Sequence, residues 1–141
     1  MTGTRGGAIA RAAQHFDDGS FVGGLARLVA SPTQSQLPDA HAALAHYFDE
    51  TLGPDLDALG FTQTLLENPV PEAGPVLVAE RHEGDSLPTV LVYGHGDTVR
   101  GQDESWRDGL KPWEITVEGD RWYGRGTADN KGQHTINFAA L

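Results

Sequence analysis

The stretch LVYGHGDTV, residues 91–99, joins an apolar run to a histidine and an aspartate, with a glycine on each side of the histidine. Continuous apolar runs of this kind are typical of strands that are buried on both faces. Side chains alternate along a strand, so His95 and Asp97 would point to the same side if the extended run continues that far. Gly94 and Gly96 remove bulk around the imidazole and let another loop approach. The stretch therefore predicts a site at the end of a strand.

The preceding segments predict an α/β fold in which helices flank a mostly parallel sheet. Ser20 can cap a helix that runs to about residue 30. Asp39 can cap a second helix, which Gly53-Pro54 kinks and Gly60 ends. Strand-like runs then follow at residues 61–66, 75–81 and 89–94.

The second half of the chain predicts a hairpin and a final helix. Residues 113–124 form two short strand-like runs, with a turn at residues 118–120. Asp129 or Asn130 would cap a helix that continues to the last residue. Three tryptophans are expected to pack the hairpin rather than to bind a ligand: Trp106, Trp113 and Trp122.

The composition narrows the possible functions. The chain has 141 residues, of which 38% are apolar and 21% charged, which is typical of a globular domain with a core. Its net charge of -10 argues against nucleic acid as a partner, because phosphate binding needs a basic face. No apolar run approaches the roughly 20 residues that span a bilayer, and the N-terminus lacks the apolar segment of a signal peptide. We therefore expect a cytoplasmic protein with no membrane partner.

Cysteine is absent, so any metal site must use histidine and carboxylate ligands. A neutral histidine can bind a metal through one ring nitrogen while a carboxylate holds the N–H group of the other. His95 and Asp97 suit these two roles. The structural alternative is a strand end closed by a hydrogen-bonded histidine, and for an isolated His-x-Asp pattern this alternative is favoured.

A second segment, YGRGTADNKG at residues 123–132, crowds three glycines and Asp129 into a turn before the last helix. It is not a phosphate-binding P-loop, because the spacing G-x-x-x-x-G-K-[ST] is missing. It is not a dinucleotide fingerprint either, because no strand–G-x-G-x-x-G–helix unit is present. Taken alone, the segment is equally compatible with a hairpin exit that ends in an Asp or Asn helix cap.

Taken together, GHGDTV at residues 94–99 and GRGTADNKG at residues 124–132 are far more specific than either segment alone. In this order they resemble the dinuclear zinc hydrolases of peptidase family M20, which include aminoacylases, acetylornithine deacetylases, carboxypeptidase G and dipeptidases. The resemblance runs from about residue 20 to the end of the sequence.

This resemblance implies a role for each site residue. His95 would bind one metal ion, Asp97 would support that histidine, and Asp129 would bridge two metal ions. The resemblance also implies a cis peptide bond between Asp129 and Asn130. Nitrogen and oxygen ligands suit zinc, and cobalt or manganese can substitute for it. A shared carboxylate would hold both cations and offset their repulsion.

The implied function is metal-dependent hydrolysis of amide bonds in N-acyl amino acids or short peptides, by a water molecule that two metal ions activate. The general base of the family is the first of two adjacent glutamates, and this sequence contains no Glu-Glu pair. We therefore interpret residues 1–141 as the N-terminal portion of a catalytic domain, without the lid or dimerisation domain. The portion alone is expected to be inactive, and the whole parent enzyme can form a homodimer.

A different class of function stays open, in which the chain is a non-catalytic module that binds a partner through an unfinished sheet edge. A Glu-Glu pair encoded a few dozen residues downstream would favour the enzyme, and an immediate stop codon would favour the module. Peptidase, deacylase and carbamoylase activities share the two segments, so the sequence does not select among these substrates.

Three further residues lie close to the second segment. His134 is expected to be an ordinary polar residue of the last helix, with a place beside the metal ions as the alternative. Arg125 and Lys131 would neutralise Asp129, steer an acidic substrate or pair with local carboxylates.

Overall fold

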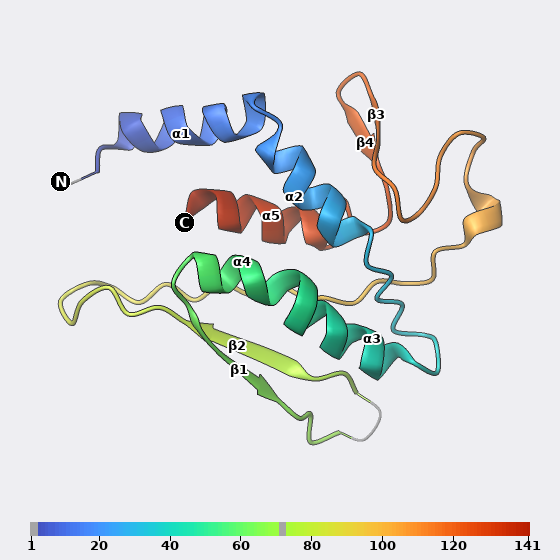
Figure 1. Ribbon diagram of the computed structural model, residues 1–141, viewed down its shortest axis with the longest axis horizontal. Helices are drawn as coiled ribbons and strands as arrows, with labels where there is room; N and C mark the ends of the chain where they lie inside the picture. The colour runs from blue at the N-terminus through green and yellow to red at the C-terminus, as the bar shows by residue number, and fades with distance from the viewer. Residues whose placement is uncertain (1–2, 71–72) are drawn as a thin grey trace.

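The computed structural model describes residues 3–70 and 73–141. Five α-helices, a π-helical turn, a 3-10 turn and four short strands follow one another along these residues (Figure 1). In chain order they are α1 (Arg5–Asp17), α2 (Ser20–Val29), α3 (Ala40–His46), η1 (Tyr47–Leu52), α4 (Gly53–Ala58), β1 (Thr62–Leu66), β2 (Val76–Glu80), η2 (Asp103–Ser105), β3 (Thr116–Glu118), β4 (Arg121–Tyr123) and α5 (Lys131–Ala140).

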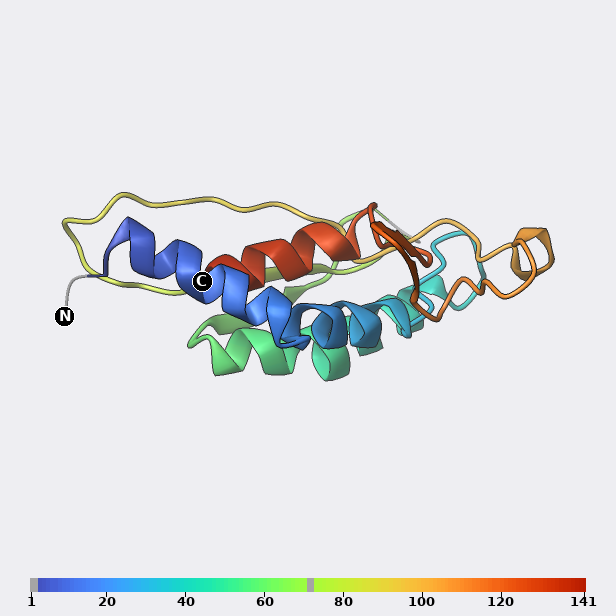
Figure 2. The same ribbon diagram turned by 90° about the horizontal axis from the view of Figure 1, so that it is seen from above.

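The helices α3, η1 and α4 run on from one another as a single rod between the β1–β2 hairpin and the pair α2 and α5 (Figure 1). Seen from above, the molecule is elongated, with the β3–β4 hairpin and the η2 loop toward one end (Figure 2). No helix in the described part of the chain has the length and apolar character needed to cross a membrane.

The core lies where α2 packs against this rod. Leu25 and Leu28 of α2 are 2% and 1% exposed, as the apolar face of the predicted helix requires. Leu28 belongs to a buried cluster with Tyr47, Leu52 and Leu56. The residues partly buried against this cluster are Leu44, Phe48, Phe61, Leu77, Ala79 and Phe138. This core joins the first half of the chain to α5.

The helices begin and end close to the residues predicted from the sequence, but the capping interaction of α2 differs from the predicted one. Ser20 is the first residue of α2 rather than its cap, because Gly19 takes the cap position with a left-handed φ of 84° and Asp18 accepts a hydrogen bond from the Ser20 N–H group. The predicted break at Gly53-Pro54 is the junction where η1 passes into α4. Gly60, with a φ of 80°, follows the end of α4 as predicted.

The predicted mixture of helices and strands is confirmed, but the strand pairing differs from the expected parallel arrangement. β1 pairs with β2, and β3 with β4, and both pairs are antiparallel. The physical reason is the length of the connections, since a parallel crossover needs a dozen or more residues and the connection from β1 to β2 is shorter. Residues 89–94 form no strand, because no other described segment pairs with them.

The start of α5 packs so tightly against the turn before it that glycine is required at position 132. A side-chain carbon added at Gly132 would collide with the backbone carbonyl oxygen of Thr127. In the same turn the Gly132 N–H group donates to the Gly126 carbonyl at 3.2 Å. A carbon added at Gly23, inside α2, would meet no atom within 4 Å.

These two glycines predict opposite responses to alanine. Gly132→Ala should lower the free energy of unfolding by roughly 1–3 kcal/mol, because the backbone must move to relieve the collision. Gly23→Ala should raise it by about 0.5–1 kcal/mol, because alanine favours the helix and reduces the entropy of the unfolded chain. Urea denaturation followed by circular dichroism measures both changes. Equal stability of the two variants would contradict the packing described for the turn.

Candidate metal centre

The segment that carries His95 is held by the loop that follows α2. The Thr98 N–H group donates to the Thr33 carbonyl at 2.8 Å, and the Thr33 hydroxyl donates to the Gly96 carbonyl at 2.6 Å. Gln34 and Thr98 form an isolated parallel bridge. Thr33 and Thr98 are 2% and 3% exposed, so these bonds are shielded from water. The loop at residues 31–35 therefore fixes the backbone on the C-terminal side of His95.

The two glycines beside His95 are sites of close approach, as the sequence predicts. A side-chain carbon at Gly94 would collide with the His134 ring and lie 2.8 Å from the Asn130 Oδ1 atom. A side-chain carbon at Gly96 would lie 2.8–3.0 Å from atoms of Phe48, Leu44 and Tyr47. Neighbouring side chains from the α3–η1 rod and from α5 thus press against the backbone of residues 94–96.

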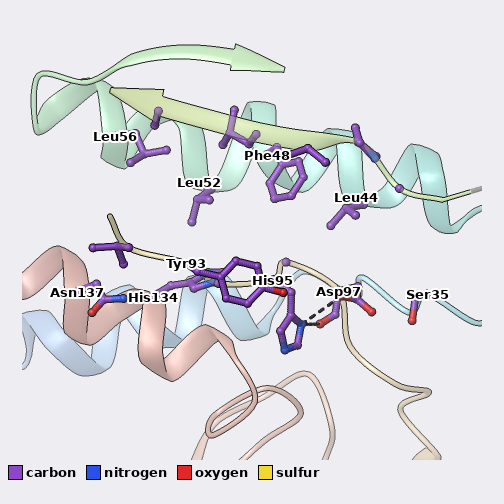
Figure 3. A pocket seen from close by; sticks show the side chains of 18 of the residues that line it. Ser35, Leu44, Phe48, Leu52, Leu56, Tyr93, His95, Asp97, His134 and Asn137 are labelled. Carbon is purple, nitrogen blue, oxygen red and sulfur yellow. Dashed lines mark hydrogen bonds and ion pairs between the residues drawn. The ribbon is translucent and has the colours of Figure 1, made fainter. Parts of the chain in front are cut away.

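His95 lies between two carboxylates that are far apart in sequence. Its Nδ1 atom is 3.1 Å from Asp97 Oδ1 and 3.0 Å from the Asp97 carbonyl (Figure 3). Its Nε2 atom is 2.8 Å from Asp129 Oδ1. The side chain of Asp129 is 87% exposed, whereas that of His95 is 35% exposed. The structure therefore brings together all three residues that the sequence singles out, with the imidazole in the middle.

The two carboxylates also change the pKa of the imidazole. Burial acts to lower the pKa of His95, but the hydrogen bond with Asp129 and the contacts with Asp97 outweigh it, so the net pKa is raised above its ordinary value. Positive charge is thus favoured between Asp97 and Asp129. The same electrostatic field favours a metal cation at this position, provided that the imidazole has lost its proton.

Asp129 and Asn130 form the entry to α5, which begins at Lys131. The peptide bond between Asp129 and Asn130 is cis, as the family resemblance implies. Asn130 occupies the helix cap position, but its side chain makes no hydrogen bond to the helix. Its Oδ1 atom instead accepts a hydrogen bond from the backbone N–H group of His95 at 2.9 Å. The predicted helix cap is therefore wrong in its chemistry, because a long-range acceptor role replaces the local one.

Lys131 and Arg125 form no ion pair with a carboxylate in the described part of the chain, which differs from two of the roles expected from the sequence; steering of an acidic substrate stays a prediction. Lys131 is fully buried, donates from Nζ to the Ser31 carbonyl at 2.5 Å, and lies 4.9 Å from the centre of the Tyr47 ring. Burial lowers the pKa of Lys131 to about 8. Arg125 donates to a backbone carbonyl and stacks over a tryptophan. The spacing of residues in the second motif could not predict these carbonyl and aromatic partners, because all of them lie outside that motif.

His134 is a buried residue and not an exposed one. It is 8% exposed, and its ring lies against Gly94 and 6.5 Å from the centre of the Phe138 ring. Its Nδ1 atom has no hydrogen-bond partner among the described residues. Burial, together with the nearby charges of His95 and Lys131, lowers the pKa of His134 to about 4. The ring is therefore neutral at pH 7.

A cavity of about 680 Å³ opens beside these residues (Figure 3). One wall is apolar and comes from the α3–η1–α4 rod and β2, and the opposite wall comes from residues 92–97 and α5. The titratable side chains on that opposite wall are Tyr93, His95, Asp97 and His134. The site is thus next to a large, mostly apolar space.

The residues present fit a part of a metal centre. Two ligands of one tetrahedral zinc ion, each about 2.0–2.2 Å from it, stand roughly 3.3 Å apart, so His95 and Asp129 at 2.8 Å need only a small shift to hold a common ion. Within residues 3–70 and 73–141, no group of three or more histidine, aspartate or glutamate residues is arranged to hold a metal. A tight zinc site needs additional ligands.

The mixed fold, with a histidine between two carboxylates, resembles a part of a metal-dependent peptidase. Residues 91–141 match the model of peptidase family M20/M25/M40. The resemblance predicted from the two motifs is therefore confirmed, since M20 dipeptidases and acetylornithine deacetylases are homologues of this chain.

Two relatives illustrate the extent of the similarity. The cysteinylglycine-S-conjugate dipeptidase of Corynebacterium striatum is 28% identical over 118 residues, which are 83% of this chain and 25% of that protein. The acetylornithine deacetylase of Pasteurella multocida is 31% identical over 113 residues, which are 80% of this chain and 28% of that protein. The chain thus spans about a quarter of the length of these relatives.

Two solved structures have the same fold over nearly the whole chain. Human carnosine dipeptidase 1 is 27% identical with a TM-score of 0.74, and the match covers 93% of this chain and 30% of that one. The di-peptidase Dug1p from Saccharomyces cerevisiae has a TM-score of 0.79 at 20% identity, and the match covers 94% of this chain and 29% of that one.

The buried His134 predicts a loss of stability in acid. The unfolded chain binds a proton at His134 with a pKa of 6.5 and the folded chain with a pKa of about 4. Between these values the unfolded state holds more protons, so stability falls as the pH falls from 6.5 to 4, by at most about 3 kcal/mol. The variant His134→Leu should lack this contribution.

The measurement is the free energy of unfolding of both proteins in urea, from about pH 4 to about pH 7. His95, whose raised pKa gives the opposite sign, is present in both proteins, so the difference between them isolates His134. A difference that does not change with pH over this range would show that the buried ring is not the source.

Proposed function

We propose that this chain is the N-terminal portion of a metal-dependent hydrolase that cleaves amide bonds of N-acyl amino acids or short peptides. The observation that carries the proposal is the placement of His95 Nε2 at 2.8 Å from Asp129 Oδ1, with Asp97 on the other ring nitrogen. A surface histidine needs one carboxylate at most to be satisfied. Two carboxylates, one of them 87% exposed, leave an acidic face that is open to a cation.

Each side chain has a separate task in this proposal. His95 is a terminal metal ligand through Nε2, and Asp97 holds Nδ1 and so fixes the orientation of the ring. As the family resemblance implies, Asp129 would be shared by two metal ions; its carboxylate is exposed, and one of its two oxygen atoms makes no contact with His95. When bound, the metal ions, zinc with cobalt or manganese as substitutes, would activate a water molecule and polarise the scissile carbonyl group.

The substrate class follows from what the relatives have in common. A cysteinylglycine-S-conjugate dipeptidase, a β-Ala-His dipeptidase of Mus musculus and an acetylornithine deacetylase differ in substrate, but each name describes an amide bond to an amino acid. We therefore propose that the parent of this chain cleaves an amide bond to an amino acid, and we propose no narrower substrate. No Glu-Glu pair supplies a general base in the 141 residues, so we expect no hydrolysis by the chain alone.

One observation favours a second candidate, a binding module without catalysis. Val90, Leu91 and Tyr93 are 78%, 93% and 83% exposed, in a run of strand-forming residues that pairs with no described strand. Exposed segments of this kind accept an additional strand. The metal-binding test below separates the two candidates, because a module that only pairs strands has no need of His95.

Zinc titration of the chain by calorimetry tests the ligand assignment. The wild-type chain should bind zinc weakly and saturably, and His95→Ala and Asp129→Ala should each weaken the binding at least roughly 10-fold, because each removes one of the two proposed ligands. Exposed His82, whose Nε2 atom lies 3.1 Å from Asp85, provides a matched control: a histidine with a single carboxylate. The variant His82→Ala should bind zinc as the wild type does.

Two results would count against the proposal. If His95→Ala and His82→Ala bind zinc equally well, the metal is not held at His95. If the isolated chain hydrolyses an N-acetyl amino acid or a dipeptide, and His95→Ala retains that turnover, the metal-based mechanism is wrong as well.

A further inference from the structure

We infer that Asn130 is a positioning residue that fixes His95 in register with Asp129. The Oδ1 atom of Asn130 accepts a hydrogen bond from the backbone N–H group of His95 at 2.9 Å. This inference rests on the proposed function, since it gives Asn130 a task only if His95 and Asp129 act together. We call Asn130 a positioning residue and not a catalytic one, because its side chain bonds to the His95 backbone and to Gln133 and does not line the cavity.

The side chain of Asn130 is held at both ends. It is 6% exposed, and while its oxygen atom accepts from His95, its Nδ2 group donates to Gln133 Oε1 one turn into α5. A buried amide with both ends bonded has a fixed orientation, because a flip of the amide would place a donor against the N–H group of His95. The acceptor is therefore aimed at His95 before any ligand arrives.

Because Asn130 is next to Asp129 in the sequence, this bond fixes the position of His95 relative to Asp129. The bond joins the backbone at His95 to the residue adjacent to Asp129, although 34 residues separate the two side chains in sequence. Gly94 makes the approach possible, because a side-chain carbon there would lie 2.8 Å from Asn130 Oδ1. On the far side, Lys131 anchors the same turn to the Ser31 carbonyl.

An asparagine at the start of a helix usually caps it by accepting a hydrogen bond from a backbone N–H group of the first turn. Asn130 stands at the cap position of α5, yet its side chain bonds to none of the free N–H groups of that helix. The Asn130 side chain therefore does not contribute a capping bond to the stability of α5, and bonds instead to the backbone N–H group of His95. Small changes of this kind around a ligand alter metal affinity by roughly 10–100-fold in metalloproteins, because they decide whether ligands converge.

The test uses the 141-residue chain with three substitutions and a matched control. Asn130→Ala removes the acceptor, and Asn130→Asp keeps an acceptor of the same shape. Gln133→Ala, at an exposed helical position, leaves the fold intact and frees only the amide of Asn130. The control is Asn68→Ala, because Asn68 makes an equivalent pair of bonds in another turn, accepting from Val70 N–H and donating to the Gly74 carbonyl.

The first measurement is made without metal. Amide hydrogen exchange at His95, and the ¹⁵N shifts of its ring, report whether the backbone and the imidazole keep their places. Asn130→Ala should speed exchange of the His95 amide at least roughly 10-fold and shift both ring nitrogens. Gln133→Ala and Asn130→Asp both keep the acceptor but lose its bond to Gln133, so each should speed exchange by a smaller factor, and Asn68→Ala should leave both signals unchanged. An unchanged His95 amide in Asn130→Ala would overturn the inference.

The second measurement is zinc affinity. Asn130→Ala should weaken zinc binding roughly 10-fold, whereas Asn130→Asp should bind zinc at least as tightly as wild type and Asn68→Ala should match wild type. If exchange at His95 rises but zinc affinity does not fall, the positioning role is refuted while the ligand assignment stands. If the wild-type chain binds no zinc, the proposed function fails, and the exchange result still decides by itself whether Asn130 fixes His95.

Discussion

The structure depends on the absence of side chains at Gly94 and Gly96. At Gly94 the backbone is contacted by His134 of α5 and by Asn130, the cap residue of that helix. At Gly96 it is contacted by Leu44, Tyr47 and Phe48 of the α3–η1 rod. Any side chain at either glycine would separate α5 from the α3–η1 rod, and with it Asp129 from His95. The glycines of the first motif therefore serve packing, and the site follows from that packing.

Lys131 shows how the second loop is secured from the opposite side. A fully buried ammonium group is costly unless polar contacts replace its water, and here the Ser31 carbonyl and the face of the Tyr47 ring replace it. The cost remains visible in the pKa, which burial lowers to about 8. The same loop at residues 31–35 also holds the backbone after His95. The loop at residues 31–35 therefore supports both halves of the site, although Lys131 lies 100 residues beyond Ser31 in the chain.

The sequence predicted that His95, Asp97 and Asp129 would come together, but not the contacts that hold them. These three residues were chosen because they stand in two motifs that together resemble a known family; the structure brings them together, and their roles stay a prediction. The helices α2 and α5 and the β3–β4 hairpin could be found from periodicity and turn residues. The acceptor role of Asn130 and the burial of Lys131 and His134 could not, because each depends on a partner dozens of residues away. The parallel sheet was wrong for a similar reason, since hydrophobic pattern identifies strands but does not select their partners.

The candidate metal site and the exposed apolar run at residues 90–93 border the same cavity. The cavity of about 680 Å³ that His95, Asp97 and His134 border is also bordered by Val92 and Tyr93, from the exposed apolar run. The run at residues 90–93 pairs with no described strand, and the proposed cation site has two ligands where a tight zinc site needs more. Both border the cavity, so groups that enter it could complete both. An element that entered the cavity would bury the apolar run and could bring ligands to His95 at the same time. Packing and metal binding are for this reason expected to be coupled, and the backbone at residues 90–97 is where the coupling acts.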